Sequence, residues 1–129
     1  MSEFSNALSV SASGLKAQSQ RLRHVAENIA NADTPGYRRK TVAFNPERGP
    51  DAKGRVETGP VRLDRSDLRR IYDPAHPLAD ESGHVAGSNV DLMIEIADAR
   101  EAQRSYEANL RMFDQARQMS SSLMDLLRR

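Results

Sequence analysis

The side chains best suited to chemistry gather between residues 73 and 84 of this 129-residue chain. Carboxylates and imidazoles are the oxygen and nitrogen ligands of divalent metals. Their spacing here matches no metal motif such as His-Glu-x-x-His. A metal-dependent hydrolase built on this segment stays an alternative hypothesis, beside the plainer interpretation of a polar surface loop. The side chains concerned are Asp73, His76, Asp80, Glu81 and His84.

Other catalytic and binding patterns are missing from the sequence. It contains no phosphate-binding glycine loop and no Gly-x-Ser-x-Gly, and the lack of cysteine excludes disulfides and thiolate sites. The basic run 38–40 (Arg38-Arg39-Lys40) stands in a chain of net charge +1 with 5% aromatic residues. Such a run predicts a turn that faces solvent or neighbouring molecules rather than nucleic acid. We expect no enzymatic activity, no metal or other cofactor and no nucleic-acid partner.

Backbone chemistry divides the chain into three segments, 1–40, 41–88 and 89–129. All six prolines and six of the seven glycines lie in the middle of the chain, between residues 35 and 87. Gly14 is the exception, and a glycine inside a helix costs about 1 kcal/mol relative to alanine. The sequence therefore predicts a mainly α fold with long terminal helices around a short β and loop segment.

A heptad pattern predicts the first helix over residues 4–32. Large aliphatic residues recur every seven positions, with small residues four positions after the first three. Together these large and small residues form a stripe along one side of the helix, here called the seam. Such a seam buries little apolar area, so we expect the isolated helix to be only marginally stable. The pattern fits a coiled coil and an ordinary amphipathic helix equally well. The large residues are Leu8, Leu15, Leu22 and Ile29, and the small ones are Ala12, Ser19 and Ala26.

A second pattern predicts a helix over residues 89–127, about 57 Å long. Ser88 with Asp91 three positions later suggests a capping box at its start. Methionines and Leu126 widen its apolar face beyond one stripe, which indicates more than one packing partner. The stripe consists of Leu92, Ile96, Ala99, Ala102, Tyr106, Leu110, Phe113, Ala116, Leu123 and Leu127.

The segment between the helices reads as short strands and turns. Strand-like runs at 41–44, 55–57, 61–63 and 68–72 are each bounded by proline, glycine or aspartate. They predict a small hairpin element with extended loops.

The end of the first helix carries a stop signal. Pro35-Gly36 fits the centre of a type II turn, in which glycine takes a positive φ. Asn28 and Asn31 share one face of the last helical turn. The simplest interpretation of these two amides is that they satisfy carbonyl groups near the helix terminus.

Three blocks of sequence carry a resemblance to a known family. Residues 28–37, Asn-Ile-Ala-Asn-Ala-Asp-Thr-Pro-Gly-Tyr, resemble the N-terminal signature of the bacterial flagellar axial proteins, which build the rod and hook. Residues 89–92, Asn-Val-Asp-Leu, and the Arg-x-Tyr-x-Ala-Asn element within 102–109 are similar to the family's C-terminal block. Residues 71–85 are similar to the proximal rod proteins in particular. Residues 45–70 add nothing to the resemblance.

The resemblance implies a structural subunit without catalytic activity. In this family the terminal helices pair as a coiled coil and pack with neighbouring subunits into the wall of a tube, with the middle segment outside. The motif and turn residues would then be Asn28, Asn31, Thr34, Pro35, Gly36 and Tyr37. The helix and subunit interface would contain Leu8, Leu15, Leu22, Ile29, Leu92, Ile96, Tyr106, Asn109, Phe113, Leu123 and Leu127.

The resemblance also implies partners and a location. The partners are further copies of the chain, a related proximal rod protein (FlgB-like), the rod adaptor (FliE-like) and the next rod protein outward. Composition alone, without a long apolar run or a Sec-type signal, favours a cytoplasmic protein that does not insert into membranes. The resemblance instead implies export through the flagellar type III apparatus, without a cleaved Sec signal, to the basal-body rod in the periplasm. A cytoplasmic helical adaptor or export chaperone is the alternative from another class.

Overall fold

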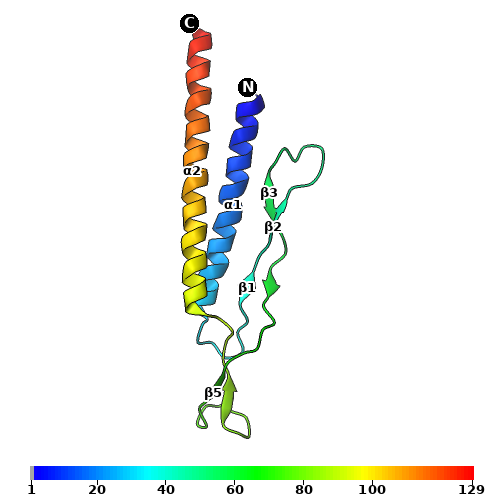
Figure 1. The fold of residues 1–129 in the computed structure, drawn as a ribbon, viewed down its shortest axis with the longest axis vertical. Coiled ribbons are helices and arrows are strands. Elements are labelled where there is room, and N and C mark those ends of the chain that lie inside the picture. The colour runs from blue at the N-terminus through cyan, green and yellow to red at the C-terminus, as the bar shows by residue number, and fades with distance from the viewer. Residues whose placement is uncertain (1) are drawn as a thin grey trace.

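Two long helices and six short strands make up residues 2–129, which the computed structural model describes. Helix α1 (Ser2–Ala30) and helix α2 (Leu92–Arg128) run antiparallel, side by side, with the strands along one flank and at one end (Figure 1). The C-terminal end of α2 continues past the start of α1. This arrangement confirms the predicted mainly α fold with a short-stranded middle segment.

Helix α1 turns toward α2 a face that its heptad pattern did not indicate. Its buried residues are Ser11, Ala17, His24, Val25 and Asn28. Gly14 decides this orientation, because a Cβ at that position would lie 2.9 Å from the side chain of Asn109 in α2. The expectation for the predicted small seam residues was wrong, since Ala12, Ser19 and Ala26 are all exposed.

Helix α2 begins at Leu92 with Asp91 as its N-cap, and the Asp91 side chain accepts a hydrogen bond from the amide of Met93 at 3.0 Å. The predicted capping box was therefore wrong. Ser88 lies in extended chain before the helix, where its hydroxyl donates to the carbonyl of Ala32 just after α1. The serine ties the two helix ends together rather than capping one of them.

The predicted apolar stripe of α2 splits between two faces. Ile96 and Leu110 are 45% and 41% exposed on its outer side, whereas Leu92 and Leu127 are 48% and 71% exposed at its two ends. The face toward α1 carries small, polar and a few large residues, namely Glu95, Ala99, Ala102, Tyr106, Asn109, Phe113, Ala116, Ser120 and Leu123. Within residues 2–129 the buried apolar side chains are all alanine or valine: Ala17, Val25, Val85, Val90 and Ala102.

The first part of the middle segment is one antiparallel ribbon beside α1 (Figure 1). Strand β1 (Lys40–Thr41) pairs with β4 (Arg62–Leu63). Farther along the same ribbon, β2 (Phe44–Pro46) pairs with β3 (Val56–Thr58). One extra residue lies between the two pairs on the returning strand, as in a β-bulge. The predicted runs 55–57 and 61–63 thus pair with residues 40–46 and not with each other. The predicted strand 41–44 is broken between β1 and β2.

The second part of the middle segment is a hairpin at the end of the molecule opposite the helix tips (Figure 1). Strand β5 (Arg70–Tyr72) pairs with β6 (His84–Ala86), with Ile71 opposite Val85. The sequence predicted a strand around β5 but missed β6, because a three-residue run between two glycines carries too short a pattern. The loop 73–83 connects the two strands.

Candidate functional site

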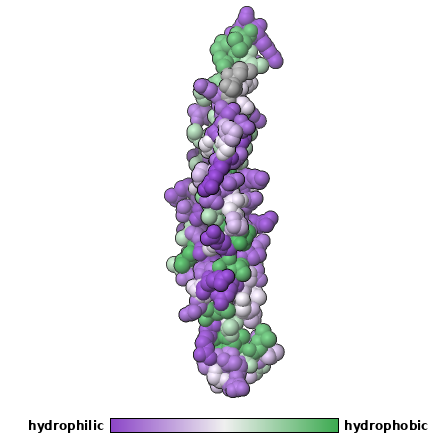
Figure 2. All heavy atoms as spheres, turned by 90° about the vertical axis from the view of Figure 1, so that its right-hand side faces the viewer, coloured by the Kyte–Doolittle hydropathy of each residue, from purple (hydrophilic) through white to green (hydrophobic). Residues whose placement is uncertain are grey.

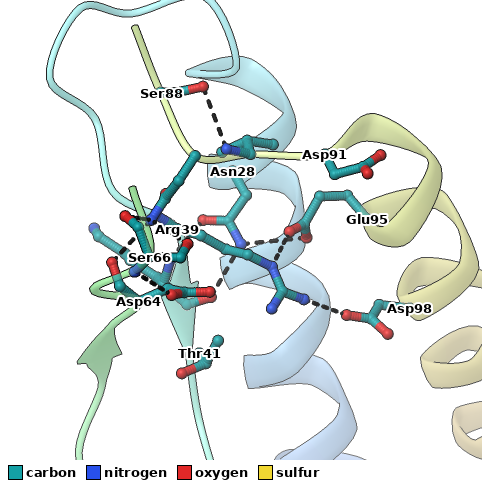
Figure 3. Close-up of polar contacts among 12 residues, drawn as sticks. Asn28, Arg39, Thr41, Asp64, Ser66, Ser88, Asp91, Glu95 and Asp98 are labelled. Carbon is teal, nitrogen blue, oxygen red and sulfur yellow. Dashed lines mark hydrogen bonds and ion pairs between the residues drawn. The ribbon is translucent and has the colours of Figure 1, made fainter. Parts of the chain in front are cut away.

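A buried polar cluster lies where α1, β1 and α2 meet (Figure 3). The Asn28 side chain is 1% exposed and uses its full hydrogen-bonding capacity. Its amide nitrogen donates to the Lys40 carbonyl at 3.0 Å and to Glu95 at 3.2 Å. Its oxygen accepts from the Lys40 amide at 2.9 Å and from the Tyr37 hydroxyl at 2.8 Å. Asn28 therefore joins α1 to the chain leaving it and to α2, rather than satisfying carbonyls at a frayed end.

Asn31 behaves as the simpler interpretation predicts. Its amide nitrogen donates to the carbonyl of Glu27, one turn earlier, at 2.8 Å. Its side-chain oxygen accepts from the hydroxyl of Thr34 at 3.1 Å. Asn31 thus closes the end of α1 and leads into the turn.

Glu95 is the charged centre of the cluster and is fully buried. The Arg39 guanidinium pairs with Glu95 through Nε and with Asp98 through Nη2 at 2.6 Å. Burial would lower the pKa of Arg39, but the hydrogen bond and charge of Glu95 outweigh it and raise that pKa. Because a buried carboxylate is costly unless it is paired, Arg39 and Glu95 fix each other's position.

The other two residues of the basic run also make contacts within the chain. Arg38 donates to the carbonyls of Asp64 at 3.3 Å and Ser66 at 3.0 Å. Lys40 lies 3.0 Å from Glu27, and this hydrogen bond raises the pKa of Lys40 and lowers that of Glu27.

The expectation that the basic run faces solvent or neighbouring molecules was therefore wrong for Arg39, whose side chain is 20% exposed, while Lys40 keeps 37% of its side chain exposed. Residues 38–40 cross the end of the helix pair at which α1 finishes and α2 begins, here called the base. Acidic side chains of α1 and α2 point toward them.

Asn89 connects this cluster to the turn after β4. Its oxygen accepts from the Arg39 amide at 2.7 Å, and its amide nitrogen donates to the Asp64 carbonyl at 2.9 Å and the Ser66 hydroxyl at 3.2 Å. Hydrogen bonds from Ser66 lower the pKa of Asp64. The start of the Asn-Val-Asp block thus holds the middle segment against the helix pair.

The turn after α1 has the geometry that its sequence predicts. Gly36 has φ 74°, and the Tyr37 amide donates to the Thr34 carbonyl at 3.2 Å. The Gly36 amide in turn donates to the carbonyl of Ala86 in β6 at 3.1 Å. Burial raises the pKa of the Tyr37 hydroxyl, which stays a donor to Asn28. The turn therefore sets the direction of the middle segment relative to α1.

Three side chains of the 73–84 segment, His76, Asp80 and His84, make hydrogen bonds within the hairpin loop. The Asp80 carboxylate accepts from the Ser82 amide at 2.9 Å, the Ser82 hydroxyl at 2.7 Å and the His84 amide at 2.9 Å. These bonds, led by that from the Ser82 hydroxyl, lower the pKa of Asp80 to about 2. His76 accepts from the Leu78 amide through Nδ1. Within residues 2–129, no group of three or more acidic or histidine side chains has the geometry to hold a metal ion.

The expected interface residues divide between two environments. Seven of them are half-buried: Leu8, Leu15, Leu22, Tyr106, Asn109, Phe113 and Leu123. Four are exposed, namely Ile29, Leu92, Ile96 and Leu127. Methionines at 93, 112, 119 and 124 are also exposed, at further positions around α2. In the described part of the chain, neither helix is apolar enough over a sufficient length to cross a membrane.

Sequence patterns did not indicate Glu95 or the close approach at Gly14. In the run 92–96, Leu-Met-Ile-Glu-Ile, the acid lies inside and its apolar neighbours lie outside. The only local sign of the buried Glu95 is that an acidic residue interrupts an apolar run. Its burial is explained by its pairing with Arg39, which is 56 residues away in sequence.

Two sequence models of flagellar families match this chain. The family described as "Flagella basal body rod protein" matches residues 8–38, and "Flagellar basal body rod FlgEFG protein C-terminal" matches residues 81–126. Over an alignment of 136 residues the chain is 47% identical to the flagellar basal-body rod protein FlgC of Agrobacterium fabrum, covering 99% of this chain and 98% of the relative. The FlgC proteins of Salmonella typhimurium and Borreliella burgdorferi are 34% and 31% identical, and each alignment covers at least 94% of both chains.

The chain belongs to the FlgC family of flagellar basal-body rod proteins. It is a structural subunit of the basal-body rod. The N-terminal match ends at Arg38, inside the polar cluster, and the C-terminal match contains Asn89, Glu95 and the whole contact face of α2. The two matched regions are therefore the ones that the buried cluster joins.

Proposed function

We propose that this chain is a proximal rod subunit that assembles through its terminal helices into the tubular shaft that transmits torque for flagellar motility. The observation that carries the proposal is the row of exposed apolar side chains along α2, on the side that α1 does not cover. Met93, Ile96 and Leu110 are 79%, 45% and 41% exposed there.

An apolar surface of this extent is costly in a separate molecule. Monomeric proteins rarely expose contiguous apolar patches of more than a few hundred Å². The inner face of α2 is already occupied by α1, so the outer face needs a different partner. Two dissimilar faces on one helix pair favour head-to-tail contacts, which generate rings or open helical assemblies. A tubular wall of repeated helix pairs meets this requirement.

Each of the three segments has its own role in this proposal. Residues 1–40 and 89–129 form the axial helix pair of the inner wall, and residues 41–88 form the outer part. The cluster around Asn28, Arg39 and Glu95 supports this division, because it fixes the middle segment to the base of the helices. A shaft that transmits torque needs such rigid internal joints.

The proposed partners are further copies of the chain, FlgB-like and FliE-like proteins and the next rod protein outward. We propose export through the flagellar type III apparatus without a cleaved Sec signal, followed by assembly in the periplasm. We further propose that the chain has no catalytic activity. The structural use of Asp80, His76 and His84 in folding their own loop supports this last point.

The proposal can be tested by asking whether the chain is recovered with detergent-extracted basal bodies. The double variant Ile96→Asp and Leu110→Asp places charge on the outer face of α2 and should be missing from basal bodies, with motility lost. Gln115→Asp, an exposed polar position on another side of the same helix, is the matched control and should assemble. Recovery of the unmodified chain as a discrete cytoplasmic dimer, and not in basal bodies, would overturn the proposal in favour of an adaptor.

A further inference from the structure

The β5–β6 hairpin and its loop, residues 70–86 and here called the foot, expose apolar side chains at one end of the molecule. Ile71, Tyr72 and Leu78 are 50%, 68% and 66% exposed. Figure 2 shows hydrophobic residues gathered at this end and again at the opposite end. The foot lies at the end of the molecule away from the tips of the helices (Figure 1).

The foot holds its exposed side chains in a defined shape. The Asp73 amide donates to the Gly83 carbonyl at 2.9 Å, and the three bonds to Asp80 close the loop. The Tyr72 ring packs edge-on against His84 with 5.3 Å between centroids. Gly83 has φ 79°, and a Cβ there would lie 3.0 Å from the Tyr72 ring. A surface ordered in advance loses less conformational entropy when it binds.

The foot is also acidic. Residues 70–86 have one basic side chain, Arg70, and three acidic ones, Asp73, Asp80 and Glu81. The net charge of the foot is therefore −2. Asp80 remains ionised at neutral pH because its pKa is about 2. Beside the exposed apolar residues lies a cleft of about 120 Å³ whose lining includes Pro35, Ile71, Asp73 and Val85.

The opposite end of the molecule has the complementary chemistry. The last turns of α2, residues 115–129, are here called the tip, and the end of the tip extends past α1 (Figure 1). Met119, Leu126 and Leu127 are 53–71% exposed there. The tip has three basic side chains, Arg117, Arg128 and Arg129, and one acidic side chain, Asp125. Its net charge is therefore +2.

We infer that the foot is the docking site for the C-terminal helix end of the adjoining rod subunit along the axis, an end that presents aliphatic side chains flanked by arginines. Foot and tip lie at opposite ends of one chain, so each needs another molecule. Each copy of this chain carries a helix end of this kind, because Leu126 and Leu127 of the tip are exposed next to Arg128 and Arg129. The inference rests on the proposed function and names the partner of one of its surfaces.

A photo-reactive benzoylphenylalanine at Leu78 tests the contact in assembled rods. After irradiation of cells, basal bodies are extracted and the cross-linked peptide is identified by mass spectrometry. We expect an adduct with a C-terminal helical segment of a rod-family subunit. Val61, 47% exposed beside β4 and outside the foot, is the control position and should yield a different partner peptide. An adduct of Leu78 with any other segment, or none, would overturn the inference.

Substitutions on the foot test its chemistry. Leu78→Glu and Glu81→Lys should each lower the capture of the C-terminal segment about fivefold or more, the size expected for contacts that matter to binding. The cross-linker then stands at Tyr72, and Leu78→Met and Glu81→Asp are the conservative controls. Unchanged capture would overturn the inference. If the unmodified chain is missing from basal bodies, the proposed function fails and the docking with it. If the chain is present but captures another segment, the docking alone fails.

Discussion

The two ends of the helix pair are built in opposite ways. At the base, α1, α2 and the ribbon are joined by buried polar groups, with Glu95 fully buried and Asn28 using every hydrogen-bonding group of its amide. At the tip, α2 stands beyond α1 and exposes leucine and methionine.

The difference indicates which geometry belongs to the single chain and which depends on assembly. Hydrogen bonds and ion pairs are directional, so the base has one arrangement before any partner arrives. Apolar contacts at the tip are not directional and can be completed by whichever neighbour covers them. The core supports this division. Its buried apolar residues in the described chain are alanines and valines alone, so the polar contacts of the base carry much of the specificity of the fold.

The largest expected effect comes from breaking the base. Glu95→Ala leaves Arg39 and Asn28 without their common partner, and removal of one member of a buried pair costs about 3–5 kcal/mol. In a chain with so small a core, the helical signal in circular dichroism should collapse. Glu101→Ala is the control, because that side chain is 69% exposed and pairs with Arg21 at 3.5 Å. Equal urea midpoints for Glu95→Ala and the unmodified chain would show that the base is not the joint described here.

A smaller effect is expected between the two ends, where the helices approach most closely. Gly14→Leu forces a side chain into the space of Asn109 and should cost about 1–3 kcal/mol of unfolding free energy, as overpacking does. Asn109→Ala in the same chain should restore part of the loss. A double-mutant cycle by urea unfolding measures this coupling. Additive effects of the two substitutions would contradict a contact between these positions.

Substitution of Gly36, in the turn that follows α1, should cost conformational free energy without a steric clash. Gly36 has φ 74°, and a Cβ there would meet no atom within 4 Å. Gly36→Val should therefore cost about 1–2 kcal/mol through left-handed backbone strain alone, and motility should fall. Gly36→Asn is the matched control, because asparagine tolerates this conformation. Normal swimming of Gly36→Val on soft agar would contradict the assigned turn geometry.

The smallest effect concerns the foot. The pKa of Asp80 is lowered from 3.8 to about 2, so its contribution to loop stability is complete above pH 4 and is lost as the pH falls toward 2. The amides of Ser82 and His84, which donate to Asp80, should lose exchange protection over this acidic range. Asp80→Asn should remove the pH dependence. Protection that stays constant from pH 4 to pH 2 would show that Asp80 does not hold the loop.

Local patterns predicted the elements better than their contacts. Prolines and glycines placed the helices within a few residues of their observed ends, and Pro35-Gly36 predicted the positive φ at the turn. The ribbon was harder to predict, because strands of two or three residues carry almost no periodicity. The small residues of the α1 seam, Ala12, Ser19 and Ala26, were predicted wrongly, because a heptad pattern identifies a stripe but not which neighbour it meets.

The sequence by itself determined the helical ends, the stop after α1 and the family, because these depend on residue types at short spacing. Tertiary structure alone decided which side of each helix is inside. Glu95 is buried among exposed apolar neighbours because Arg39 and Asn28 arrive from elsewhere in the chain to neutralise it and hydrogen-bond to it. Gly14 likewise faces α2 because only a residue without Cβ leaves room for Asn109. Such choices depend on pairs of residues far apart in sequence, and no local pattern contains both members of the pair.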